Sequence, residues 1–161
     1  MRIFREIRNF AGVLSTDFMR YSIRFFISWI LAALAMYGAF YVWHGVVLND
    51  FKQIQFPIVW FVLLSAFAYL IIAYILYRVF ETKILTYFDN IMMRGFVSAL
   101  IVGTSLFAIM TVLHISFTKN MTTTYLVTDF FWQIVEQSIG AVFIVLGKHF
   151  IFEPDFEHEE A

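Results

Sequence analysis

The sequence predicts an all-α polytopic membrane protein, because four long apolar segments take up most of its 161 residues. The segments run over residues 25–49, 53–77, 95–118 and 130–147. A helix crosses a bilayer in about 17–25 apolar residues, and only helices and closed barrels satisfy the backbone in lipid. The strands of a barrel alternate over about 10 residues, so these continuous runs favour helices. The composition, 61% hydrophobic and 14% charged, is also typical of a membrane bundle.

Basic residues are concentrated on one side of these four predicted spans. Nine of the 11 lie before the first span, between the second and third, or after the fourth, and two lie in the other connections. The positive-inside rule therefore places both termini and the middle connection in the cytoplasm. The chain contains no cysteine, which excludes disulfides and a cysteine nucleophile.

The chain is predicted to have three parts. Residues 1–20 are expected to form an amphipathic interfacial helix, because apolar side chains recur there at helical spacing and the arginines take other positions. Residues 21–152 form the four-helix transmembrane domain, and residues 153–161 form an acidic cytoplasmic tail.

The transmembrane domain is predicted to be a parallel duplication of a two-helix hairpin. Repeat one covers about residues 24–81 and repeat two about residues 94–153, with residues 24–50 aligning without gaps on residues 94–120. The matches include polar residues at the membrane edges: Arg24 with Arg94, Ser28 with Ser98, and His44 with His114. Since each repeat has two spans, both copies keep one orientation.

Glu136 is the charged residue inside a predicted span and the first candidate for a functional role. It lies about six residues into the fourth span, roughly 9 Å from the outer edge. A charge near the bilayer centre costs about 2.5–3.5 kcal/mol on insertion scales. Gln133, Glu136 and Gln137 form a polar stripe, which we expect to line a substrate-binding cavity. Interhelical hydrogen bonding that holds the bundle together is the alternative.

Four basic residues mark the inner ends of the four spans and are candidates for binding a phosphate group: Arg24, Arg78, Arg94 and Lys148. Clusters of arginine and lysine bind lipid phosphates. The alternative is that these side chains only anchor the helices by snorkelling to the interface.

His44 and His114 lie at matched depths on the first and third spans. Paired histidines on facing helices can ligate a b-type haem, and interface anchoring beside Trp43 is the alternative. The sequence has no phosphate-binding glycine loop and no metal-ligand motif. We therefore expect no resident cofactor, no metal site, no enzymatic activity and no nucleic-acid partner.

The ends of the spans carry a recurring pattern. The first span opens with Arg24-Phe25-Phe26, and the second and fourth close on aromatic and basic residues over 73–80 and 137–152. These motifs are similar to those of the GtrA-like family of small four-span bacterial membrane proteins. The resemblance covers about residues 20–153.

This resemblance implies a flippase of the bacterial cytoplasmic (inner) membrane. Such a protein translocates a polyprenyl-phosphate-linked monosaccharide for cell-surface glycan modification and works beside a glycosyltransferase. The polar stripe would shelter the sugar, the basic residues would recruit the phosphate, and a homodimer or higher homo-oligomer is expected. Two alternatives stay open. One is a non-transporting anchor or accessory subunit of a glycosyltransferase or other membrane complex, and the other is a b-type haem electron carrier.

Overall fold

The computed structural model describes residues 23–48, 50–53, 57–117 and 122–150. The interfacial helix expected over residues 1–20 and the acidic tail at 153–161 lie outside these described residues. The regular elements are α2 (Ile23–Phe40), η1 (Tyr41–Val47), η2 (Asp50–Gln53), α3 (Ile58–Phe80), η3 (Leu85–Tyr87), α4 (Ile91–Phe117) and α5 (Thr123–Phe150). All of them are helical, which confirms the predicted fold class.

Four helical segments of the described chain are long and apolar enough to cross a membrane: Ile23–Val47, Ile58–Phe80, Ile91–Leu113 and Thr123–Phe150. Many of their large apolar side chains point outward, and Trp60, Leu64 and Val112 are 60%, 59% and 65% exposed. An apolar surface on this scale is stable in hydrocarbon and not in water. The chain is therefore a multi-pass membrane protein.

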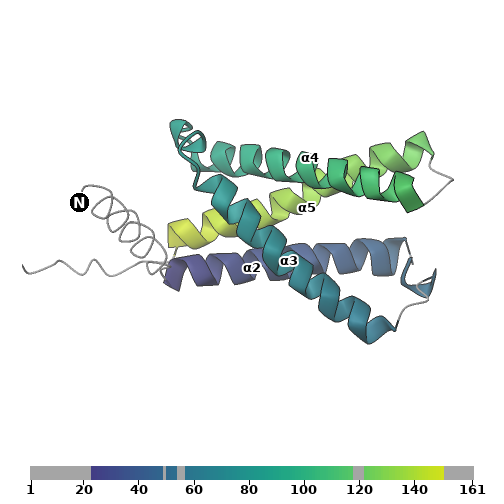
Figure 1. Ribbon diagram of the computed structural model, residues 1–161. Coiled ribbons are helices and arrows are strands. Elements are labelled where there is room, and N and C mark those ends of the chain that lie inside the picture. Colours follow the sequence, from purple (N-terminus) through teal and green to yellow (C-terminus); the bar gives the residue numbers. More distant parts are fainter. Residues whose placement is uncertain (1–22, 49, 54–56, 118–121, 151–161) are drawn as a thin grey trace, which may run out of the picture.

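The four helices form one bundle whose two ends differ in charge. α2 and α4 begin, and α3 and α5 end, at the same end of the bundle (Figure 1). We call it the basic end, because Arg24, Arg78, Arg94 and Lys148 lie near it. α5 packs along both α2 and α4, whereas α3 packs mainly on α2 and diverges from α4 toward the opposite end.

Glycines allow α5 to approach its neighbours closely. A Cβ added at Gly147 would overlap the Ser28 hydroxyl of α2 and lie 3.2 Å from the Ser28 Cα atom. A Cβ at Gly140 would lie 2.9 Å from Met36 Cγ and 3.0 Å from a Leu76 methyl group. In lipid, where no hydrophobic force drives helices together, such close backbone packing is a main source of association.

The duplication stays a prediction, because Ser28 and Ser98 make a local hydrogen bond that Ser65, Ser105 and Ser138 also make. Ser28 donates a hydrogen bond to the Arg24 carbonyl oxygen at 2.7 Å, and Ser98 donates to the Arg94 carbonyl oxygen at 2.7 Å. Both serines are fully buried. The two repeats differ, however, in how they meet. In a duplicated bundle the α3–α4 contact corresponds to the α5–α2 contact, yet α5 and α2 pack closely while α3 and α4 diverge.

Candidate functional site

Glu136 lies at the middle of α5, 13 residues after Thr123 and 14 before Phe150. At 1.5 Å per residue its position is about 20 Å from either end of the helix. α5 begins seven residues before the apolar run that starts at residue 130, and the depth of roughly 9 Å below the outer membrane edge stays a prediction. The threonines and Asp129 in this first part lower its hydropathy and hid the true start of the helix.

The Glu136 carboxyl is held by a tyrosine from another helix. Tyr69, at the middle of α3, donates its hydroxyl to Glu136 Oε1 at 2.7 Å. Both residues are buried, with Glu136 2% and Tyr69 8% exposed. A buried polar group without a partner is costly, so this bond both stabilises the acid and joins α3 to α5. The pairing could be suspected from the sequence only through the position of Tyr69 at the centre of an apolar span.

A pocket of about 410 Å³ lies beside this pair. Its polar lining comes from three elements: His44 of η1, Ser65 and Tyr69 of α3, and Trp132, Gln133 and Glu136 of α5. Aromatic and aliphatic side chains form the rest. Ala68 of α3 and Met110 of α4 also line the pocket and are exposed on the outer surface of the bundle. The mouth of the pocket therefore opens between α3 and α4, toward the lipid.

The structure separates the three residues of the predicted polar stripe. Gln133 and Glu136 both line the pocket, and Gln137 does not. Gln137 is fully buried, and neither its amide nitrogen nor its amide oxygen has a hydrogen-bond partner among the described residues. One residue is a 100° step around a helix of 3.6 residues per turn, so a side chain next to Glu136 points elsewhere.

Two tryptophans form a stacked pair next to the pocket. The rings of Trp43 and Trp132 lie 4.2 Å apart at an interplanar angle of 10°. Both indole N–H groups are buried. Because Trp132 lies four residues before Glu136 on α5, the two side chains share one face of the helix. Trp132 thus adds a hydrogen-bond donor and a flat ring to the region of the carboxyl.

His44 lies in the π-helical segment η1, which continues α2 toward the opposite end of the bundle. Its ring is 4.9 Å from the Phe40 ring, and it lines the pocket. Short π-helical segments within helices occur frequently at functional sites. The side chain of His114 lies outside the described residues, so the haem pairing stays a prediction. Within the described ranges, no group of three or more His, Asp or Glu side chains could hold a metal ion.

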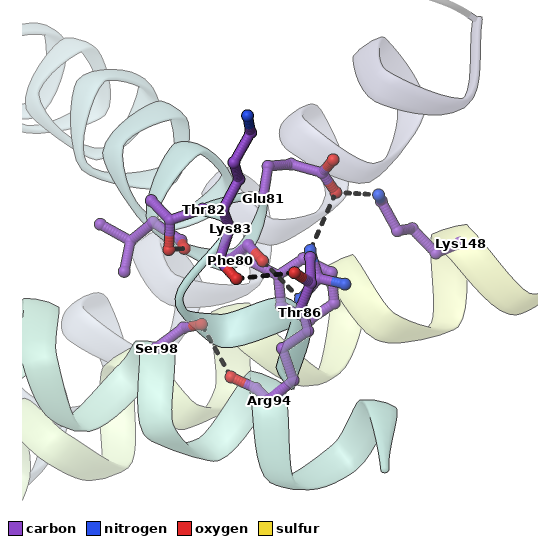
Figure 2. A network of polar contacts seen from close by, with 9 residues as sticks. Phe80, Glu81, Thr82, Lys83, Thr86, Arg94, Ser98 and Lys148 are labelled. Carbon is purple, nitrogen blue, oxygen red and sulfur yellow. Dashed lines mark hydrogen bonds and ion pairs between the residues drawn. The ribbon is translucent and has the colours of Figure 1, made fainter. Parts of the chain in front are cut away.

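At the basic end, two of the four predicted phosphate-binding residues meet at a single acid. Glu81, directly after α3, forms an ion pair with Lys148 of α5, and its Oε1 is 3.8 Å from Arg94 Nη2 of α4 (Figure 2). Arg78 is exposed, and Arg24 is half-buried at the start of α2. The sequence did not single out Glu81, although an acid among basic residues at the end of a span was a visible signal.

Aromatic rings and a carbonyl group hold the two cations independently of Glu81. Arg94 Nε donates to the Phe80 carbonyl oxygen at 2.6 Å, and the guanidinium carbon lies 4.4 Å from the centre of the Phe80 ring. Lys148 Nζ lies 5.4 Å from the Tyr77 ring and 5.5 Å from the Phe80 ring. Cation–π contacts of this kind favour a fixed position for each charge.

No protein-family model, curated protein or solved structure matches the chain. The resemblance to the GtrA-like family therefore stays a prediction. The function has to be inferred from the pocket and from the basic end.

Proposed function

We propose that the chain is a carrier that moves a polyprenyl-phosphate-linked monosaccharide between the two leaflets of the membrane. The observation that carries the proposal is the pocket at mid-bundle, with Glu136 and Tyr69 in its wall and its mouth on the lipid side. A sugar phosphate cannot cross hydrocarbon unaided, because unpaired polar and charged groups there cost several kcal/mol. A pocket with hydrogen-bonding groups at the middle of the bundle lowers this barrier.

The chemistry of the pocket suits a sugar. Glu136 and Gln133 supply oxygen acceptors, and Gln133 and Trp132 supply N–H donors, which match the hydroxyl groups around a sugar ring. The flat face of a sugar is apolar, and aromatic side chains such as Phe61 cover it well. A volume of about 410 Å³ is at the lower end of the range of about 300–1,000 Å³ for small-molecule sites, so it favours one sugar over an oligosaccharide.

The position of the mouth explains how a lipid could use this site. A long polyprenyl tail would stay in the bilayer and only the head group would enter, because the pocket opens between α3 and α4 toward lipid. Met110, an exposed side chain that lines the pocket, is apolar and compatible with such a tail. The tail therefore never has to leave the hydrocarbon.

The test is a translocation assay with the full chain in sealed vesicles. Polyprenyl-phosphate-glucose is placed in one leaflet, and its appearance in the other is followed by oxidation with membrane-impermeant periodate. We expect transfer above the protein-free rate and a loss of tenfold or more in Glu136→Ala, because the sugar loses a buried partner. Leu64→Ala, which changes a lipid-facing residue of α3, is the matched control and should transfer at the wild-type rate.

Two outcomes would reject the carrier. The first is wild-type transfer no faster than in protein-free vesicles. The second is an equal loss of transfer in Glu136→Ala and Leu64→Ala. If the wild-type chain is inactive alone but raises the activity of a bound glycosyltransferase, the accessory role replaces the carrier.

A further inference from the structure

Two polar contacts at the same register join α3 to α5. Tyr69 pairs with Glu136 at mid-bundle, and Glu81 pairs with Lys148 at the basic end. In both pairs the partners are 67 positions apart. Since the two helices run in the same direction, the contacts lie 12 residues apart on each, which is about 18 Å along the axis.

At the basic end, two cations, Lys148 and Arg94, form a site for an anion, and the Glu81 carboxylate occupies it. Lys148 and Arg94 come from two different helices, and their side chains are 21% and 16% exposed. Glu81 is the most accessible of the three, at 38% exposed. The aromatic rings and the Phe80 carbonyl keep the cations in place without the carboxylate. Glu81 is therefore the member of the cluster that can leave with the least rearrangement.

We propose that the phosphate of the lipid replaces the Glu81 carboxylate on Lys148 and Arg94, and that this exchange frees the basic end of α3 from α5. The identity of the lipid rests on the proposed function. A phosphate diester carries one negative charge, as a carboxylate does, so the exchange leaves no uncompensated cation. Arginine also binds phosphate with two parallel hydrogen bonds, whereas Arg94 contacts Glu81 at 3.8 Å through one nitrogen.

The separation of the two contacts sets the order of events. A single sugar ring and the phosphate bonded to it are much shorter than about 18 Å. One lipid therefore cannot displace Glu81 and fill the pocket beside Glu136 at the same time. The lipid head group therefore occupies the basic end and the pocket one after the other. At each stage one of the two polar contacts still holds α3 to α5.

Binding measurements on the full-length chain in nanodiscs test the exchange, with radiolabelled polyprenyl-phosphate-glucose, a diester that carries one negative charge, as the probe. Lys148→Gln removes a cation and should weaken binding about tenfold. Glu81→Gln is nearly isosteric and removes the competing carboxylate, so it should tighten binding about fivefold. Asp89→Asn changes another exposed acid of the same connection and should bind as the wild type does.

The direction of the Glu81→Gln effect decides the proposal. Weaker or unchanged binding overturns it, since a residue that only braces the cations would weaken the site on removal. Glu81→Asp, which shortens the side chain, provides a second variant and should tighten binding less than Glu81→Gln. If inorganic phosphate competes as strongly as the unlabelled lipid, the site takes free phosphate and the lipid assignment is overturned. Tighter binding by Glu81→Gln without translocation in vesicles keeps the exchange and rejects the carrier.

Discussion

Replacing Gly147 by alanine tests the close approach of α5 to α2, on which the whole arrangement depends. The added Cβ would overlap the Ser28 hydroxyl and lie 2.8 Å from Ser28 Cβ and 3.2 Å from Ser28 Cα. Rotation of the serine side chain relieves the contact with the hydroxyl only. Ordinary contacts begin at 3.4 Å, so the two helices must separate by roughly half an ångström at this point.

The expected cost follows from two opposing effects. Forcing an extra methyl group into a packed interface costs about 1–3 kcal/mol, and a gap of this size forfeits a quarter or more of the dispersion energy of the contacts it opens. Alanine has a higher helix propensity than glycine by about 1 kcal/mol, which offsets part of the loss. We therefore expect Gly147→Ala to lower the free energy of unfolding by about 1–2 kcal/mol.

Unfolding of the purified protein in detergent measures this change. Gly38→Ala is the matched control on α2, because nothing lies within 4 Å of a Cβ placed there, and it should leave stability unchanged or slightly higher. Combining Gly147→Ala with Ser28→Gly removes the contacts with the Ser28 side chain and leaves the 3.2 Å contact with its Cα atom, so the double variant should be more stable than the sum of the single changes predicts. If Gly147→Ala and Gly38→Ala have the same stability, α2 and α5 do not approach as closely as described.

Three further predictions concern the pocket. Tyr69→Phe removes the donor to the buried Glu136 carboxyl and should lower the free energy of unfolding, measured by denaturant titration, by about 0.5–2 kcal/mol. Glu136→Gln keeps an acceptor and should lower it by less. Equal losses in the two variants would contradict the hydrogen bond. Ala68→Phe places a ring at the mouth and should slow transfer of the sugar lipid about tenfold while changing stability by less than about 0.5 kcal/mol. Unchanged transfer would place the route elsewhere. Freshly purified protein should show no Soret band, and a band that disappears in His44→Ala would identify a haem ligand instead.

The four spans were predictable from the sequence because continuous apolar runs have one stable arrangement in a bilayer. The bounds of the helices were harder to predict from the sequence. α5 begins at Thr123 and not near residue 130, because polar residues at a helix start resemble a loop in a hydropathy pattern. The π-helical turn of η1 has no signal in the sequence that we can identify.

Only some of the residues of the pocket could be predicted from the sequence. Glu136 was predictable as a functional candidate, because a charge in hydrocarbon is costly. Its partner Tyr69 and the acid Glu81 were not predicted, because a contact between residues 67 positions apart depends on where α3 lies. Gln137 was predicted to line the cavity and does not, because helical spacing does not tell which neighbouring helix each side chain will contact.

The unequal packing of the two hairpins has a consequence for the symmetry of the bundle. Two identical hairpins joined around a two-fold axis would have two equivalent seams, and both would be open or both sealed. Here the α2–α5 interface is closely packed, with Gly147 against Ser28, and the corresponding α3–α4 interface contains the opening of the pocket. Because the two hairpins differ in sequence, the same four helices can combine one closely packed side with one open side.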